Sequence, residues 1–390
     1  MKYYLIAGEP SGDSLGARLI KALRRKDKNA EFYGVGGEGM QAEGIKSLFN
    51  ISDLAVMGLA EVIPSIPRVL RHINETVADI QKVRPDVVVT IDSWSFSARV
   101  HKKLRQLKLN IPQVHYVAPQ VWAWKKKRAR TMYKYIDLLL TLFPQEPKYF
   151  TPYNLQTEFV GHPVIESEVV NGVKGDFKKR HHIPEENRLL LVLPGSRHNE
   201  VERLLPTFLE VVKQLHERYN DFSFVIPTVS TVAAQVKEMV KQSGLPIEIV
   251  EGTKERHDAF KSGDVAIAAS GTVALELAIV DVPHIIAYKV PKLTEWLARH
   301  FIHIQFVNLS NILLGKEIVP ELLQQDCCVE KIMYYVEQFM KHKPVYNQQM
   351  DGFEKVRKLL GMGQQTPSDN AAEAIIKTIK NYKKWKFSAK

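Results

Sequence analysis

Two successive series of short apolar runs, separated by segments with helical periodicity, constrain this chain more than any other feature. The first series lies at residues 3–7, 31–35, 87–91, 113–117, 138–142 and 158–160. The second lies at residues 189–193, 223–226, 247–250, 265–269 and 284–288. Between the first two runs, Leu15, Leu19 and Leu23 recur at helical spacing. Such alternation is typical of parallel α/β sheets, so the sequence predicts two Rossmann-like domains.

The length agrees with two domains, because single cores stop growing beyond ~250–300 residues and this chain has 390. A polar stretch at residues 166–188 separates the two series. We therefore predict a boundary near residue 168. Ligands of open α/β sheets bind beyond the carboxyl ends of the strands, so we expect the two domains to face a cleft.

The composition limits the partners. Lysine and arginine total 54 and aspartate and glutamate 43, which gives a net charge of +11. This charge favours nucleotides, phosphorylated substrates, nucleic acid or an acidic membrane surface. The two cysteines, Cys327 and Cys328, are neighbours and suit neither a disulfide framework nor a metal site, which indicates a reducing compartment. No apolar run reaches the ~18 residues that span a bilayer.

Two strand-to-helix turns in the second series predict a nucleotide site. Gly195-Ser196-Arg197 and Ser270-Gly271-Thr272 each follow an apolar run and open a helical segment. Free backbone N–H groups at such turns favour an anion, and Arg197 adds a planar fork that suits phosphate. Glu276 falls one helical turn after Thr272 and is suited to accept hydrogen bonds from ribose hydroxyls.

In the first series, residues 8–13 and Asp92 are candidates for substrate contact. Ser11, Gly12 and Asp13 follow the first strand and fit either a ligand or simple turn and capping chemistry. Asp92 ends a strand and fits either a general base or a helix cap. A G-x-G-x-x-G pattern at residues 34–39 follows the second strand instead of the first, so we interpret it as a glycine-rich connection.

Two further segments suit a surface role. Residues 56–73 are apolar with two arginines and two prolines, which fits an amphipathic lipid-contact patch, a buried core segment or a loop over the cleft. Trp122 and Trp124 precede the basic cluster 125–128, which fits a phosphate-facing loop, a basic helix start or nucleic-acid binding. The histidines are scattered and no P-loop pattern occurs, so we predict no metal and no cofactor.

Several of these motifs occur together in one order. They lie at residues 8–13, 55–58, 121–124, 193–197, 269–272 and 311–315. Over nearly its whole length the chain resembles the lipid-A-disaccharide synthase family. The resemblance implies a glycosyltransferase B-type fold with an acceptor-binding domain at 1–168 and a UDP-sugar-binding domain at 169–343. Residues 344–390 would be helices that pack on the first domain, and a homodimer is implied because some members exchange these helices.

The resemblance also implies the reaction. UDP-2,3-diacylglucosamine would donate its sugar to the 6-hydroxyl of 2,3-diacylglucosamine 1-phosphate (lipid X), giving the β(1→6) disaccharide 1-phosphate and UDP. The family works at the cytoplasmic face of the bacterial inner membrane, where an anionic surface would be a partner, and B-type enzymes usually need no metal. Asp92 and Arg197 would be catalytic. The expected substrate contacts are Ser11, Gly12, Asp13, Gln120, Trp122, Ser196, Arg197, Ser270, Gly271, Thr272, Glu276 and Asn311.

Two alternatives follow from the same features. A UDP-sugar 2-epimerase would share the nucleotide cleft but has no use for the apolar segment 56–73. A nucleic-acid-binding protein would explain the net charge and the two tryptophans. Because the cleft motifs are spread along the chain while those features are local, we predict no nucleic-acid partner.

Overall fold

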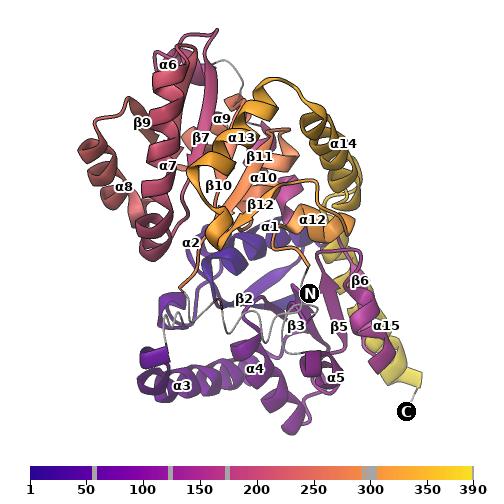
Figure 1. Ribbon diagram of the computed structural model, residues 1–390. Helices are drawn as coiled ribbons and strands as arrows, with labels where there is room; N and C mark the ends of the chain where they lie inside the picture. Colours follow the sequence, from indigo (N-terminus) through magenta and orange to yellow (C-terminus); the bar gives the residue numbers. More distant parts are fainter. Residues whose placement is uncertain (55–58, 122–125, 172–175, 292–294, 296–304, 389–390) are drawn as a thin grey trace. The chain divides into compact units, whose positions relative to one another are not determined.

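The computed structural model describes residues 1–390 except 55–58, 122–125, 172–175, 292–294, 296–304 and 389–390. It divides into two compact units, residues 1–163 with 363–390, and residues 164–362 (Figure 1). Each unit is built on one six-stranded sheet in which every pairing is parallel. The prediction of two Rossmann-like α/β domains is confirmed.

The sheet of the first unit has the order β2-β1-β3-β4-β5-β6. Its strands are β1 (Lys2–Ala7), β2 (Glu31–Val35), β3 (Val87–Ile91), β4 (Gln113–Tyr116), β5 (Leu138–Thr141) and β6 (Gln156–Phe159). All five residues of β3 are buried, as expected for a strand covered on both faces. Ala7 pairs with Ile91, so the turns that follow β1 and β3 lie side by side at one edge.

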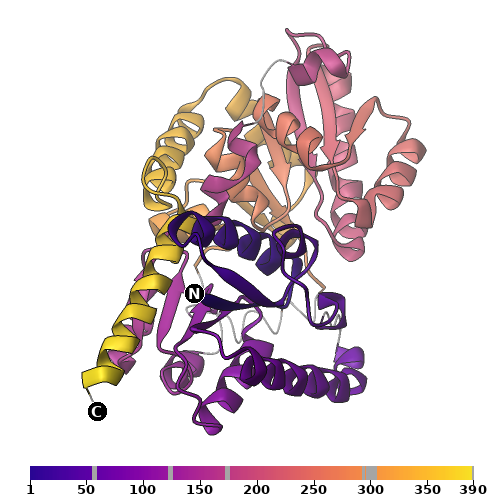
Figure 2. The same cartoon turned by 180° about the vertical axis from the view of Figure 1, so that it is seen from behind.

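Helices cover both faces of this sheet. They are α1 (Pro10–Lys26), α2 (Glu38–Ala42), α3 (Leu59–Val83), α4 (Trp94–Gln106), α5 (Ala129–Met132) and α15 (Pro367–Ser388). The buried faces of α3 and α4 share one core with Tyr4 and Ile6 of β1 and Val88 of β3. The first turns of helix α15 pack against α1 (Figure 2). Helix α15 buries Ala371, Ala372, Ile375 and Ile379, and two ion pairs, Arg25–Asp369 and Lys26–Glu373, join the two helices.

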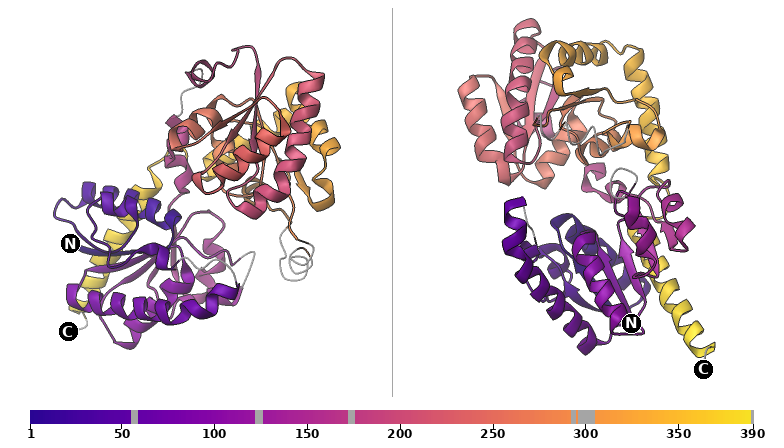
Figure 3. Two further views of the ribbon diagram at one scale, coloured as in Figure 1. Left: turned by 90° about the vertical axis from the view of Figure 1, so that its left-hand side faces the viewer. Right: turned by 60° about the horizontal axis from the view of Figure 1, so that its bottom comes forward.

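The sheet of the second unit has the order β12-β11-β10-β7-β8-β9. Its strands are β7 (Arg188–Leu193), β8 (Phe222–Pro227), β9 (Ile247–Val250), β10 (Val265–Ala268), β11 (His284–Tyr288) and β12 (Glu321–Leu323). The helices of this unit include α7 (His198–Arg218), α8 (Ser230–Ser243), α9 (Thr253–Ser262), α10 (Val273–Ile279), α12 (Leu309–Leu314), α13 (Val329–Met340) and α14 (Pro344–Leu359). Helices α7, α8 and α13 share one buried core with the sheet (Figure 3).

The C-terminal helices differ from the expectation in one respect. We expected all of residues 344–390 to pack on the first domain. Helix α14 instead belongs to the second unit, where it contacts α10, α12 and α13, and only residues 363–390 belong to the first. The physical reason is the buried side of α14: Gln349 bonds the backbone of His284, and Phe353 stacks on the His284 ring.

Candidate functional site

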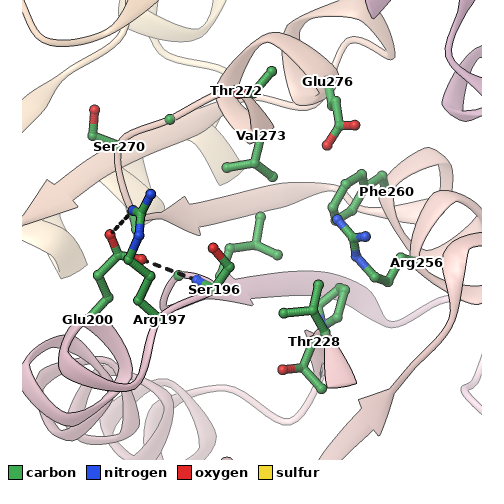
Figure 4. A pocket seen from close by; sticks show the side chains of 16 residues that line it. Ser196, Arg197, Glu200, Thr228, Arg256, Phe260, Ser270, Thr272, Val273 and Glu276 are labelled. Carbon is green, nitrogen blue, oxygen red and sulfur yellow. Dashed lines mark hydrogen bonds and ion pairs between the residues drawn. The ribbon is translucent and has the colours of Figure 1, made fainter. Parts of the chain in front are cut away.

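The loops after β7, β8 and β10 line a cavity of about 310 Å³ in the second unit (Figure 4). This is the carboxyl edge of the sheet, where open α/β folds bind ligands. The structure brings six of the predicted site residues together here, namely Ser196, Arg197, Ser270, Gly271, Thr272 and Glu276.

The turn after β10 offers backbone donors to this cavity. Gly271 has a φ of +153°, and a Cβ placed on it would meet no atom within 4 Å, so the turn is open. Within the described residues, the amides of Gly271, Thr272 and Val273 donate no backbone hydrogen bond. Unpaired amides at the start of a helix attract an anion. Glu276 lies one turn further along α10 and points into the cavity.

The turn after β7 differs, because a carboxylate of the chain itself occupies it. Glu200 Oε2 accepts a hydrogen bond from the Ser196 amide at 3.2 Å, and Oε1 accepts from Arg197 at 2.9 Å and from the Tyr288 hydroxyl at 3.0 Å. Burial and the Glu200 charge raise the pKa of Tyr288 to about 12, so the hydroxyl remains a donor. Glycine suits position 195, since its φ is +111° and a Cβ would lie 2.8 Å from the Cβ of Glu200.

Arg197 itself remains accessible. Its side chain is 74% exposed and is held by the Glu200 ion pair, whereas the side chain of Glu200 is only 10% exposed. An exposed guanidinium on one ion pair can exchange partners at little cost. Arg197 can therefore leave Glu200 for a bound phosphate.

Among the lining residues that were not predicted are Arg256, Phe260 and Thr228. Arg256 and Phe260 come from α9, with the Arg256 guanidinium carbon 5.7 Å from the centroid of the Phe260 ring, and Thr228 follows β8. In Figure 4, Arg256 and Phe260 lie at the opposite end of the cavity from Arg197 and Glu200. In the sequence Arg256 sits within the charged run 254–258, where nothing distinguishes it from a solvated residue.

In the first unit, Asp92 lies where the turns after β1 and β3 meet. Asp92 Oδ1 accepts from the Ser93 amide at 2.8 Å, and Oδ2 accepts from the Ser11 hydroxyl at 3.3 Å. Burial raises the pKa of Glu9, and the nearby Asp92 charge raises it further. The structure thus places Ser11 and Glu9 beside Asp92.

Asp13 corrects the sequence prediction. We expected it among the substrate contacts, but its carboxylate is buried and accepts from the amides of Gly37 at 2.7 Å, Gly39 at 2.8 Å and Met40 at 3.0 Å. In these bonds a carboxylate of the chain itself accepts from the amides of the glycine-rich connection, as a bound anion would at a helix N-terminus. The interpretation of residues 34–39 as a connection agrees with this arrangement.

Gly12 also has a packing explanation. A Cβ on Gly12 would lie 3.1 Å from the carbonyl oxygen of Ile91, so glycine lets α1 approach β3 closely.

Asn311 is a second correction. The residue is fully buried, its Oδ1 accepts from the amides of Ile318 and Val319, and its Nδ2 donates to the Val319 carbonyl and to Glu321. These four bonds use the whole capacity of an amide side chain, so Asn311 fixes the chain before β12 and has no bond left for a substrate.

The remaining predicted residues are dispersed. Gln120 is exposed in the loop after β4, and Trp122 lies outside the described residues. Of the apolar segment, Ile66 and Leu70 are 47% and 49% exposed on α3. No group of side chains in the described part of the chain could hold a metal ion. Among the described helices, none is long and apolar enough to cross a bilayer.

Two units that each contain a parallel sheet, with a cavity at the carboxyl edge of the second sheet, define a two-domain α/β enzyme fold of the B-type glycosyltransferase class. A putative UDP-N-acetylglucosamine 2-epimerase from Listeria monocytogenes shares this fold with a TM-score of 0.65 and 16% identity, covering 98% of this chain and 96% of that chain. A UDP-GlcNAc 2-epimerase from Neisseria meningitidis gives a TM-score of 0.62 and 13% identity over 98% and 100%. A glycosyltransferase from Rickettsia africae gives 0.59 and 11% over 98% of each chain. At these identities the likeness concerns the fold alone.

Sequence relatives define the family. The lipid-A-disaccharide synthetase family model matches residues 3–375. The lipid-A-disaccharide synthase of Paramagnetospirillum magneticum is 46% identical over 98% of this chain and 99% of its own, and that of Rhodospirillum centenum is 45% identical over 96% and 94%. The chain belongs to the lipid-A-disaccharide synthase family. The predicted resemblance is therefore confirmed, and it is favoured over the epimerase alternative.

Proposed function

We propose that this chain is an inverting glycosyltransferase that joins UDP-2,3-diacylglucosamine to 2,3-diacylglucosamine 1-phosphate and releases UDP. The observation that carries the proposal is the cavity after β7, β8 and β10, which combines open amides, two arginines and Glu276 in a chain of this family. The residues that line this cavity match a nucleoside diphosphate, because they offer hydrogen-bond donors for the phosphates and a carboxylate for the ribose hydroxyls.

The diphosphate needs several donors at once. A helix end contributes typically ~0.3–1 kcal/mol toward an anion, which is too little to stabilise a leaving diphosphate. In our proposal the amides of residues 271–273 hold it while Arg197 turns from Glu200 onto a phosphate oxygen as charge develops there. Arg256 supplies a second positive charge at the other end of the cavity. Glu276 binds the ribose.

Asp92 acts as the general base in this proposal. It takes the proton of the acceptor 6-hydroxyl as that oxygen forms a bond to the anomeric carbon, and the bond between that carbon and the diphosphate oxygen breaks. Attack opposite the leaving group converts the α-linked donor into a β-linked product. General-base catalysis contributes ~10²–10⁴-fold.

The lipid substrates suggest a membrane-surface role for α3. Ile66 and Leu70 are exposed apolar residues, and Arg68 and Arg71 are exposed beside them. Apolar and cationic side chains on one helix suit contact with acyl chains and anionic head groups. We propose that the protein works at the cytoplasmic face of the inner membrane and that two copies associate as a homodimer.

The test is incubation with both acyl sugars, followed by mass spectrometry for the disaccharide 1-phosphate and an assay for UDP. Each substrate alone is the control. Product from both substrates supports the proposal. Absence of the disaccharide, with conversion of a UDP-sugar to its 2-epimer, would instead support the epimerase alternative. Flotation with anionic and neutral vesicles at low and high salt tests the surface contact, and light scattering tests the dimer.

A further inference from the structure

Three residues other than glycine have left-handed backbone at the ends of two neighbouring strands. Asp92 (φ +56°) and Ser93 (φ +44°) follow β3, and Val117 (φ +81°) follows β4. For a β-branched residue this conformation is an outlier, because its Cβ crowds the backbone. Such conformations persist only where the surrounding structure holds them, and they concentrate at functional sites. Because β3 pairs with β4, both turns lie at the edge that carries Asp92.

A buried hydroxyl group connects the elements that carry these turns. Thr90 Oγ1 lies 2.7 Å from His101 Nε2 and 2.7 Å from His115 Nδ1, and all three residues are fully buried. Thr90 precedes Asp92 by two residues on β3, and His115 precedes Val117 by two on β4. His101 is on α4, which begins directly after Ser93. The Thr90 hydroxyl therefore links β3 to β4 through His115, and it links β3 to α4 through His101.

The contacts of Gln113 determine which atom donates and which accepts in each hydrogen bond of this group. With its amide nitrogen toward His101 Nδ1 at 2.7 Å, Gln113 also accepts from Arg105 Nε at 3.2 Å, so both ends of the amide are used. His101 Nε2–H then donates to Thr90, and the Thr90 hydroxyl donates to His115 Nδ1. Burial keeps both rings neutral, since it lowers the pKa of His101 to about 4 and that of His115 well below its usual range.

His115 also contacts the two turns themselves. Its ring lies 4.7 Å from that of Trp94, the first residue of α4, which directly follows Ser93. Its Nε2 makes no hydrogen bond of regular geometry within the described residues, although the Val117 backbone is close enough to raise the pKa of the ring against the effect of burial. The His115 ring thus contacts Trp94, next to the Asp92–Ser93 turn, and lies near the backbone of Val117 in the other turn.

We propose that Thr90, His101, His115 and Gln113, here called the Thr90 cluster, are positioning residues that hold the Asp92–Ser93 and Val117 turns in the geometry of the reaction. None of them touches substrate; they act through Asp92. The inference rests on the proposed role of Asp92 as base.

The test compares Thr90→Val with Thr90→Ser. Valine has the shape of threonine but breaks both hydrogen bonds at once, whereas serine keeps the hydroxyl. We expect Thr90→Val to lower kcat by about 10- to 100-fold, because small misplacements of a catalytic group cost this much, and Thr90→Ser to restore it. The affinity for UDP, whose proposed site lies in the other unit, stays at the wild-type value, and circular dichroism reports the folded fraction.

Hydrogen exchange gives a readout that does not depend on activity. The Asp92 amide donates to Tyr116 and the Val117 amide donates to Leu140, so both are protected. Faster exchange at Asp92 and Val117 in Thr90→Val, together with the loss of kcat, supports the proposal. Wild-type kcat in a folded Thr90→Val, or unchanged exchange at these amides, overturns it. If Thr90→Val does not fold, Gln113→Leu removes the hydrogen bond between Gln113 and His101 instead and is judged by the same criteria.

The two proposals can fail separately. If the wild-type protein forms no disaccharide, the proposed function fails, and exchange at Asp92 and Val117 still decides whether the Thr90 cluster holds the turns. If the wild type is active but Thr90→Val has normal kcat, only the positioning role is lost.

Discussion

Replacing Arg197 with alanine separates the stability of the second unit from its proposed chemistry. In the structure the Arg197 side chain is 74% exposed and forms one ion pair with Glu200. Exposed ion pairs contribute about 0.2–1 kcal/mol, and Glu200 keeps its bonds to Ser196 and Tyr288. The free energy of unfolding should therefore fall by no more than about 1 kcal/mol.

The effect on turnover should be much larger. A hydrogen bond to a charged group contributes about 1.5–3 kcal/mol. One or two such bonds to the diphosphate total about 1.5–6 kcal/mol, and we take about 2–4 kcal/mol as the part that is gained only as the diphosphate leaves. At 1.36 kcal/mol per tenfold, kcat/KM should fall by about 30- to 1,000-fold.

The assay is kcat/KM for disaccharide formation, with UDP affinity by calorimetry and stability by urea unfolding. Arg218→Ala is the matched control, because Arg218 lies at the far end of the same helix and forms an exposed ion pair with Glu337. A kcat/KM within twofold of wild type in a folded Arg197→Ala would refute the reasoning. A loss of several kcal/mol of stability would also contradict it, since it would make the ion pair structural.

Three further predictions follow from the same geometry. Asp92→Asn should lower kcat by about 10²–10⁴-fold with UDP affinity unchanged; normal turnover would remove Asp92 from the mechanism. Gly271→Ala should weaken UDP binding about tenfold or more in calorimetry, because the φ of +153° is unfavourable for alanine and the amides beside it would shift, and equal affinity would mean that these amides hold no phosphate. Burial lowers the pKa of His101 and His284 from 6.5 to about 4, so the unfolded chain binds more protons between these values. The contribution of these neutral histidines to the free energy of unfolding should be fully present above pH 6.5 and fall by about 3 kcal/mol per histidine as the pH drops to 4. A melting temperature that does not change over this window would contradict the lowered pKa values.

The strands of both units were predictable because each is a continuous apolar run that parallel packing buries on both faces. The strand β12 was not, since its three residues include a glutamate and resemble a loop. Helix α14 has an apolar side that suits either unit. Only the tertiary contact with His284 decides which unit it joins.

The candidate site was predictable where a local pattern determines the local structure. The turn at residues 270–272 and Glu276, one helical turn later, are set by neighbours in sequence. Arg256 reaches the same cavity from another helix, so no local pattern identifies it. At Asp13 and Asn311 a local motif was present but did not determine the role of the side chain. In the sequence a polar residue of a motif looks the same whether its partner is a ligand or the protein's own backbone.

The assignment of α15 to the first unit means that the backbone passes between the two units twice, near residues 163 and 363. A protease that cuts at only one of these passages would leave both halves covalently joined through the other. A fragment ending at residue 163 would also lack the helix that packs against α1 and would expose the surface of α1 that this helix covers. Separating the halves for biophysical work therefore calls for a circularly permuted or spliced gene that carries residues 363–390 with the amino-terminal portion.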